Sequence, residues 1–389
     1  MAGDTPSPYL LVAVGSTSYV SEISAALTAA VEDQLKMAAV DVGDSLPRHD
    51  DPTDRAAHVV VVVAVEGPES LSDQDVETVN RALEAAVPVL PVLCGAAKFR
   101  DLDAPLSMIN GVEWRNQEQV VQQIVRLLGM AEEDRKLFLS YKRADSEALA
   151  FQLRYALQDR GFDVFLDRYA IPPAVDFQDR LDIELSDKAF VLLLEGPTTI
   201  DSEWVRHEVT YALRHHISLI ALTLPGVERA QMIDSVPDEL RIRLHDTDVI
   251  DEDGQIRLTD ECLSHLLTRL EWEHALRLRR HRQQLVDTLS DWLRQSGHEV
   301  AALPGWTLVA QGGPNDGVYL ITPRAPTPED LRRADLARRG VDEQLGAIVA
   351  HNPELIDGAR KDLIVWIAGR QGDLRAEHHA GLRLITGAR

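Results

Sequence analysis

The sequence predicts an α/β protein made of two parallel-sheet units in tandem, followed by a small α+β unit. Short apolar runs alternate with longer helical patterns through the first two-thirds of the 389 residues, as in βα units around a parallel sheet. Residues 59–93 resemble residues 189–222 in the order of their elements, and the final third changes character. We therefore divide the chain into residues 1–130, 131–270 and 271–389.

The strands of the first two units are the most regular feature of the pattern. Most of them are apolar throughout, which is typical of strands buried on both faces of a sheet. We expect strands at 9–15, 58–65 and 87–93 in the first unit, and at 136–141, 162–167, 189–195 and 217–224 in the second.

An internal repeat relates the two units. The order strand, EGP, helix, strand occurs at 65–93 and again, with a shift of about 130, at 194–224. The opening strands agree as well, because LLVAVGSTS can be laid over LFLSYKRAD. Any two βα units look broadly alike, which is the alternative explanation. The shared EGP and the helix spacing favour two copies of one unit.

The last third predicts a different architecture. A long helix is expected over 270–297, ending at Gly297, since glycine is typical of helix C-termini. Strands at 306–311 and 318–322 flank the turn-rich GGPNDG, which predicts a hairpin. Helices are expected at 326–340 and 342–352, and strands at 362–369 and 381–386. The basic run RLRRHR at 277–282 is either a solvated helix face or a phosphate-binding patch.

Composition and charge exclude several classes of protein. The chain has 40 Lys and Arg against 63 Asp and Glu, a net charge of −23 that disfavours nucleic acid as a partner. Cys94 and Cys262 are the two cysteines, without CxxC spacing, so neither a disulfide framework nor a cysteine-based zinc site is expected. A reducing, cytoplasmic location fits this composition. We expect neither an export signal nor a membrane span, because the apolar runs are strand-length.

Three separated motifs in the second unit share an order with a known family. They are FLSYKRAD at 138–145, RYAIPPAVDF at 168–177 and DSEWVRHEVTYAL at 201–213. This stretch of about 135 residues resembles TIR (Toll/interleukin-1 receptor) domains, above all the NAD-cleaving kind found in prokaryotic defence proteins. The resemblance implies a flavodoxin-like, five-stranded parallel sheet. The first unit then reads as a degenerate TIR-like or generic flavodoxin-like unit that binds, docks or regulates.

The motifs also suggest where chemistry occurs. Trp204 and Glu208 are four residues apart, so on a helix they share one face. The turn at 140–145 must lie at the carboxyl ends of the strands, where ligands bind in open parallel sheets, so the two motifs can meet there. The resemblance implies that Glu208 is catalytic. It implies as substrate-binding residues Trp204, Arg143, Lys142, Tyr141, Asp167 and Phe177.

The resemblance implies an NAD glycohydrolase that releases nicotinamide and leaves ADP-ribose or cyclic ADP-ribose, in antiviral defence. NAD is then a substrate, and no cofactor is expected. A homo-oligomer through TIR domains is implied, and an activating ligand or protein could act through the first or last unit. The alternative is a non-enzymatic scaffold that acts only through TIR–TIR association. Glu208 and Trp204 favour the enzyme.

Some positions depart from the family pattern. The loop after the second strand of the second unit has Pro172, Pro173 and Ala174 where family members often have glycine, which stiffens it. The first unit has no Trp in the matching helix, and Thr78, or Glu77 after a one-residue shift, stands where the second unit has Glu208.

Other reaction chemistries lack their signatures. The pairs His215 with His216 and His378 with His379 are adjacent in sequence, so their side chains point apart and a shared metal is not expected. Asp316 precedes a strand, but no Glu-x-Lys strand follows it, so a metal-dependent nuclease is not indicated. Glycine-rich dinucleotide and phosphate loops and the GxSxG nucleophile turn are also absent from the sequence.

Overall fold

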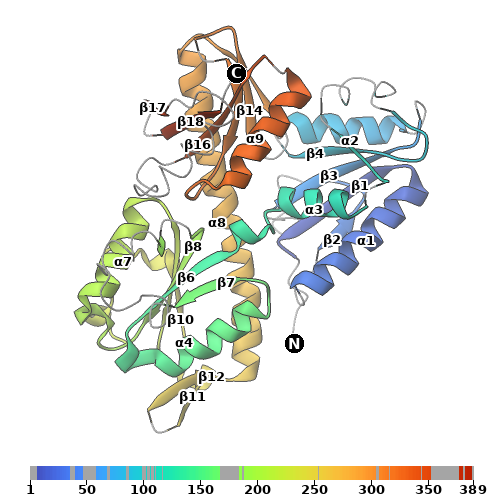
Figure 1. Cartoon of the computed structure of the whole chain (residues 1–389). Coiled ribbons are helices and arrows are strands. Elements are labelled where there is room, and N and C mark those ends of the chain that lie inside the picture. The colour runs from blue at the N-terminus through green and yellow to red at the C-terminus, as the bar shows by residue number, and fades with distance from the viewer. Residues whose placement is uncertain are drawn as a thin grey trace.

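The fold is taken from a computed structural model (Figure 1). It describes residues 7–35, 40–46, 58–67, 71–84, 87–98, 102, 106, 109, 111–115, 117–166, 184–185, 188–252, 254–303, 306–314, 316–342, 344–351, 376–379 and 382–387.

The first unit is a five-stranded sheet in which every pair of neighbours is parallel. Its order is β2-β1-β3-β4-β5. The strands are β1 (Tyr9–Gly15), β2 (Asp41–Gly43), β3 (His58–Val65), β4 (Val89–Leu93) and β5 (Val112–Glu113). The helices are α1 (Thr17–Leu35), α2 (Asp73–Glu84) and α3 (Gln117–Leu127).

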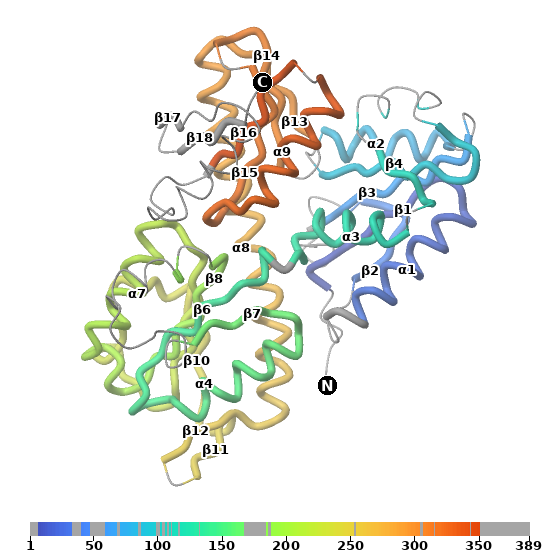
Figure 2. Tube along the Cα trace, viewed as in Figure 1, coloured from blue at the N-terminus to red at the C-terminus, as the bar shows by residue number. Residues whose placement is uncertain are grey.

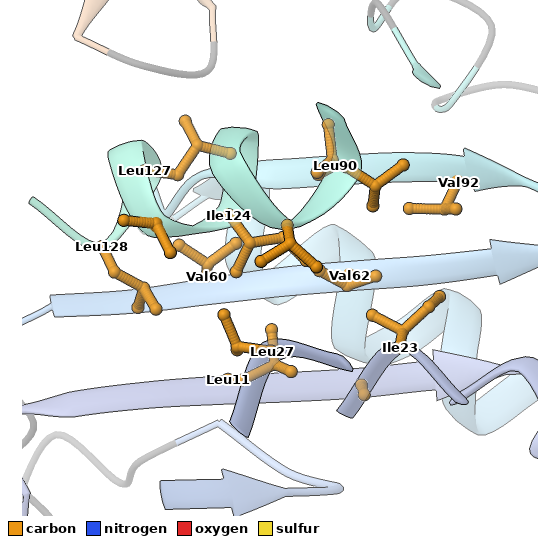
Figure 3. Packing of buried hydrophobic residues seen from close by; sticks show 14 of the residues in the cluster. Leu11, Ile23, Leu27, Val60, Val62, Leu90, Val92, Ile124, Leu127 and Leu128 are labelled. Carbon is orange, nitrogen blue, oxygen red and sulfur yellow. The ribbon is translucent and has the colours of Figure 1, made fainter. Parts of the chain in front are cut away.

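Helices cover both faces of this first sheet. On one face α1 and α3 pack side by side, where Ile23, Leu27 and Ile124 meet the strand residues Leu11 and Val60 (Figure 3). Val79 and Ala82 of α2 pack on the other face. The valine-rich β3 is buried from both sides, which explains why its sequence shows no alternation.

The second unit repeats this topology with its own elements. Its sheet has the order β10-β9-β8-β6-β7, again parallel throughout. The strands are β6 (Lys136–Tyr141), β7 (Asp163–Leu166), β8 (Phe190–Glu195), β9 (Ser218–Thr223) and β10 (Arg241–Arg243), and the main helices are α4 (Arg143–Gln158) and α7 (Glu203–Arg214). Read in chain order, both sheets are 2-1-3-4-5, the flavodoxin-like arrangement that the sequence predicted.

Smaller elements complete this unit. An antiparallel hairpin, β11 (Val249–Glu252) and β12 (Gln255–Leu258), follows the sheet, and β12 contacts α4. Single 3-10 turns are η3 (Glu132–Asp134), η4 (Thr199–Asp201), η5 (Arg229–Gln231), η6 (Asp238–Leu240) and η7 (Asp246–Asp248).

The EGP match between the two units is one residue out of structural register. In each unit, the first N–H after the fourth strand donates to a carbonyl at the end of the third strand. The acceptor is Val65 in the first unit and Glu195 in the second, so these two residues are equivalent. Glu195 is therefore inside its strand, fully buried and paired with Arg241. Glu66 lies one position later, is exposed, and accepts a hydrogen bond from Ser16. The repeated fold is confirmed, but the two glutamates have different surroundings.

Helix α8 (Asp260–Gln295, 36 residues) connects the units. Figure 1 shows it running along the second unit up to the C-terminal sheet. Leu266, Leu267 and Leu270 join the core of the second unit, Ala275 joins that of the first, and Leu289 and Leu293 join that of the third. The helix begins ten residues before the expected position 270 and passes the proposed boundary at 270 without a break. The division of the chain into domains stays a prediction.

The C-terminal unit is a six-stranded mixed sheet, ordered β13-β14-β15-β16-β18-β17, with the C-terminal part of α8 on one face and α9 on the other. Its elements are β13 (Glu299–Leu303), β14 (Thr307–Gln311), β15 (Gly317–Ile321), α9 (Pro328–Val341), β16 (Gly346–His351), β17 (Ala376–His379) and β18 (Leu382–Gly387). The β14–β15 hairpin around GGPNDG is confirmed.

One expected element of this unit is wrong. The helix expected at 342–352 is the strand β16, whose residues 347–350 are all buried. A continuous apolar run of this length suits a strand buried on both faces as well as a buried helix, so periodicity could not decide. The strand expected at 362–369 lies outside the described residues.

A cluster of buried polar side chains joins the first and second units to α8; we call it the junction cluster and define it as Tyr9, Arg135, Glu271 and His274. Figure 2 traces the chain from α3 into β6 at this point. Arg135 donates to Glu271 through Nη1 at 2.5 Å and Nη2 at 3.0 Å, and the Tyr9 hydroxyl donates to the same carboxylate at 2.7 Å. His274 Nε2 bonds to the Asp134 carbonyl at 2.8 Å.

A second ion-pair group continues toward the C-terminal unit. Asp134 pairs with Arg282 of α8 at 2.6 Å, and Arg324 pairs with Asp330 at 2.8 Å and lies 4.0 Å from Asp134. All four side chains are buried. The linker residues Asp134 and Arg135 therefore bond to two parts of α8. Arg135 bonds to Glu271, and Asp134 bonds to His274 and, three turns after Glu271, to Arg282.

Candidate functional site

The candidate site lies at the carboxyl end of β6, next to its neighbour β8, where the strand order reverses. This is the place where open parallel sheets bind ligands. The chain leaves β6 at Tyr141 and enters α4 at once, and α7 approaches from the next βα connection. Ser202 starts α7, since its Oγ accepts a hydrogen bond from the Val205 N–H at 3.3 Å.

Glu208 is the buried acid of the site. Its residue is 3% exposed, although α7 is otherwise a surface helix with polar residues on its outer side. The Ser140 hydroxyl, at the end of β6, donates a short hydrogen bond to Glu208 Oε2. Ser140 is itself buried, so the pair fixes one carboxylate oxygen against the sheet. Burial is an unusual setting for a carboxylate and is typical of functional positions.

Trp204 lies one helical turn before Glu208 and is 50% exposed. Together they line a cavity of about 350 Å³. This volume is in the range of small-molecule sites, about 300–1,000 Å³. The residues that line the cavity are Leu139, Tyr141, Lys142, Arg143, Ser202, Trp204, Val205 and Glu208. The structure thus brings together five of the seven site residues that the sequence predicted.

The two basic residues of the turn differ in their surroundings. Lys142 Nζ donates to the Thr198 carbonyl at 2.7 Å, in the loop that follows β8. Arg143 is exposed at the first position of α4. Lys142 therefore ties the cavity rim to a neighbouring loop, while Arg143 is the cation directed to solvent.

Asp145 fixes the same loop from the other side. Its carboxylate accepts hydrogen bonds from the Thr198 N–H at 2.8 Å, the Thr198 hydroxyl at 2.7 Å and the Thr199 hydroxyl at 3.1 Å. A Cβ at Gly196 would lie 2.4 Å from the Cβ of Asp145, so only glycine fits this close approach. Neither Ser140 nor Asp145 was singled out from the sequence, though both lie in the FLSYKRAD motif.

Two predicted residues cannot be placed. Asp167 and Phe177 lie outside the described residues, as do Pro172, Pro173 and Ala174 of the same loop.

The first unit has different side chains at the corresponding positions. Thr78 is buried on α2 and is followed by buried Val79 and Ala82, as Glu208 is followed by buried Val209 and Ala212. Glu77 is exposed, so Thr78 and not Glu77 is the counterpart of Glu208. The Thr78 hydroxyl bonds to its own helix, at the Gln74 carbonyl. By strand register, Val14 stands where the second unit has Ser140.

The expected separation of His215 and His216 agrees with the structure. His215 is buried with its ring 4.2 Å from that of Tyr211, whereas His216 is exposed and lines a different cavity. Within the described ranges, no three His, Cys, Asp or Glu side chains are grouped as metal ligands. No helix in the described part of the chain is long and apolar enough to cross a membrane.

Comparison with known proteins bears on the second unit. The sequence model of the TIR domain family matches residues 137–257. A search of curated proteins found no match. Among solved structures, the TIR domains of the activated Roq1 resistosome that recognises the pathogen effector XopQ align with 37% of this chain and 83% of theirs, at 13% identity and a TM-score of 0.24. Proximal thread matrix protein 1 of the mussel byssus aligns over 58% and 69%, at 13% identity and a TM-score of 0.23. At this similarity neither structure indicates a function.

Proposed function

We propose that this chain, whose residues 137–257 form a TIR domain, is an NAD glycohydrolase that releases nicotinamide from NAD. The other product is ADP-ribose, or cyclic ADP-ribose if the adenine nitrogen instead of water captures the ribosyl centre. The observation that carries the proposal is the buried Glu208 carboxylate at the base of a cavity whose rim holds an exposed Trp204.

The chemistry of NAD suits a site with one carboxylate. Nicotinamide leaves NAD as a neutral molecule from a cationic ring, so the bond breaks with little need for an acid to protonate the leaving group. Ordinary glycosidases, in contrast, use two carboxyl groups. Positive charge develops on the ribose as the bond breaks, and a fixed carboxylate stabilises it. Glu208 would supply this charge, and the hydrogen bond from Ser140 would hold it in position.

The remaining residues of the cavity suit the rest of the substrate. The indole of Trp204 offers a flat apolar surface to an aromatic base, beside the apolar side chains of Leu139 and Val205. The guanidinium of Arg143 would pair with the pyrophosphate. Lys142 would act mainly through the Thr198 loop to which it bonds.

The test is the variant Glu208→Gln. Glutamine keeps the size and a carbonyl oxygen that can still accept from Ser140, so only the charge is removed. We expect nicotinamide release to fall by a factor of about 10²–10³. The matched control is Glu203→Gln, which removes an exposed carboxylate on the same helix that does not line the cavity; it should keep activity within about twofold, as expected for a screened surface charge.

The assay is nicotinamide release from NAD by the full chain at matched protein concentrations, with circular dichroism as the folding control. A folded Glu208→Gln variant that cleaves NAD as fast as the wild type would remove Glu208 as the catalytic group. Wild-type protein that is inert over a wide range of concentrations would favour the alternative function below.

The alternative is a scaffold that acts through association of TIR domains. The half-exposed Trp204 favours it, because large exposed aromatic side chains are enriched in protein interfaces. The enzyme is compatible with association, and we propose a homo-oligomer through TIR domains, activated through the first or last unit, in cytoplasmic antiviral defence. Activity per molecule should then rise with protein concentration. Light scattering that shows only monomer at full, concentration-independent activity would contradict the oligomer.

A further inference from the structure

A second cavity, of about 230 Å³, lies between the TIR domain and α8. Its floor includes Leu213 and Ile217, from the end of α7 and the start of β9, and its rim has His216, Arg277, Arg280 and His281. The first two turns of α7, as far as Glu208, line the Glu208 cavity, and Leu213 in the last turn lines this one, so about 7.5 Å of helix separates the two linings, which share no residue. The two cavities are distinct sites.

The charge of this second cavity is opposite to that of the molecule. In a chain with net charge −23, it is lined by two arginines and two histidines and by no carboxylate. Glu273, one turn earlier on α8, pairs with Arg277 at 3.0 Å. Across the described residues, the side chains of Arg280, His281 and His216 make no hydrogen bond or ion pair to protein. They are therefore available to an anion.

The backbone at His216 gives independent support. His216 has a φ of +56°, in the left-handed region that side chains other than glycine rarely adopt. The helices α3, α4 and α8 also end near a residue of positive φ, and in each of them it is glycine: Gly129, Gly161 and Gly297. After α7 the chain instead places an imidazole at this costly position. Backbone strain of this kind is commonly found where a side chain has a functional role.

His216 and His281 lie close enough to influence each other. Burial, together with the neighbouring His216 and Arg282, lowers the pKa of His281 to about 4. His281 is thus a neutral imidazole near pH 7 in the free protein, able to donate one N–H without repelling the neighbouring arginines. A bound anion would be compensated chiefly by Arg280, since Arg277 is already paired with Glu273.

We propose that this cavity binds the phosphate group of a small molecule. Arginine pairs with phosphate through paired N–H donors, and imidazole N–H groups add further donors. The volume is below that of a drug-sized site, so it suits a phosphate group with at most a small attached part, and the apolar floor would contact that part. The ligand is either free phosphate or a small phosphate monoester. The basic run at 277–282 is then a binding surface and not only a solvated helix face.

The test measures binding and does not depend on NAD cleavage. The full chain is titrated by isothermal calorimetry with inorganic phosphate and separately with glycerol phosphate, a small monoester without an aromatic base, at constant ionic strength set by chloride. We expect saturable binding with one site per chain. Tighter binding of glycerol phosphate than of inorganic phosphate would assign the cavity to a monoester, and equal or weaker binding would assign it to free phosphate.

Matched variants locate the site. Arg280→Gln should weaken binding at least tenfold, because it removes an exposed arginine of the rim. Arg269→Gln removes another exposed arginine of the same helix that does not line the cavity, and should change the affinity by less than twofold. Arg143→Gln, in the Glu208 cavity, should also leave phosphate binding unchanged. His216→Gly should weaken binding while raising the melting temperature of the ligand-free protein, since glycine accepts the positive φ.

Three results would overturn the proposal. The first is that neither probe binds saturably to the wild type. The second is that Arg269→Gln and Arg280→Gln weaken binding equally. The third is that Arg143→Gln loses binding while Arg280→Gln retains it. None of them bears on whether the chain cleaves NAD, so the two proposals fail separately.

Discussion

Removing the charge of Glu271 should destabilise the protein far more than removing a neighbouring charge on the same helix. Arg135 is 0% exposed, and its charge is compensated by Glu271 at 2.5 and 3.0 Å. Burial alone would raise the pKa of Glu271, but the charge of Arg135 and the hydrogen bonds from Arg135 and Tyr9 hold it below its ordinary value. The variant Glu271→Gln would leave the guanidinium buried without its counter-charge.

The expected cost follows from that geometry. Breaking a buried ion pair by removing one partner costs about 3–5 kcal/mol. At about 2 °C per kcal/mol for a chain larger than a single domain, the melting temperature should fall by about 6–10 °C. The matched control is Glu273→Gln, since Glu273 pairs with Arg277 where both side chains are partly exposed. Such a pair contributes at most about 1 kcal/mol.

Thermal unfolding followed by circular dichroism measures both variants under the same conditions. A double variant, Arg135→Met with Glu271→Leu, should recover most of the loss, because apolar side chains of similar volume can replace a buried pair. Equal losses in Glu271→Gln and Glu273→Gln would refute the reasoning. That result would mean that the charge of Arg135 is compensated elsewhere.

Three further predictions concern the site and the junction cluster. Ser140→Ala removes the donor to the Glu208 carboxylate, so kcat for nicotinamide release should fall about tenfold or more with KM little changed; an unaltered kcat would show that the hydroxyl does not position the carboxylate. Thr78→Val should leave kcat within about twofold, because among the described residues this hydroxyl bonds to its own helix, at the Gln74 carbonyl; a loss comparable to that of Glu208→Gln would assign catalysis to the first unit. Burial, with the charge of Arg135, lowers the pKa of His274 to about 4, below its value in the unfolded chain. The free energy of unfolding should therefore be full above about pH 6.5 and lower by about 2 kcal/mol at pH 5, as measured by denaturant titration at pH 7 and pH 5. His274→Gln should reduce this pH dependence, and an unchanged dependence would exclude His274 as its source.

The central strands were predictable because strands buried on both faces are continuous apolar runs in the sequence. The runs of β1, β3, β6 and β8 are apolar on both faces, and the sequence placed each of them within one residue. The edge strands β2, β5 and β10 have only two or three residues, and β2 is largely exposed, so no hydrophobic pattern marks them. The hairpin β11–β12 and the strand β13 are also mostly exposed and were missed for the same reason.

The site was partly predictable because part of it is local. Trp204 and Glu208 share one helix face by spacing alone. The hydrogen bond from Ser140 to Glu208 spans 68 residues, and the contacts of Arg135 with Tyr9 and Glu271 span 126 and 136. Such contacts exist only once two or three elements have packed, so a pattern that is read along the chain contains no sign of them. The basic run at 277–282 was visible, but the concave surface that it faces comes from α7 and β9.

Helix α8 has a consequence for any attempt to divide the chain. At about 1.5 Å per residue its 36 residues extend about 54 Å, and along this length it adds side chains to the cores of all three units. A fragment that ends at residue 257, where the TIR family match stops, would leave uncovered the apolar surface that Leu266, Leu267 and Leu270 now shield. A fragment that starts after residue 270 would keep Ala275 of α8 but would lack the first unit, against whose core Ala275 packs. The three units should therefore unfold together in one transition, and the smallest soluble catalytic piece should include α8 as far as its contacts with the first unit.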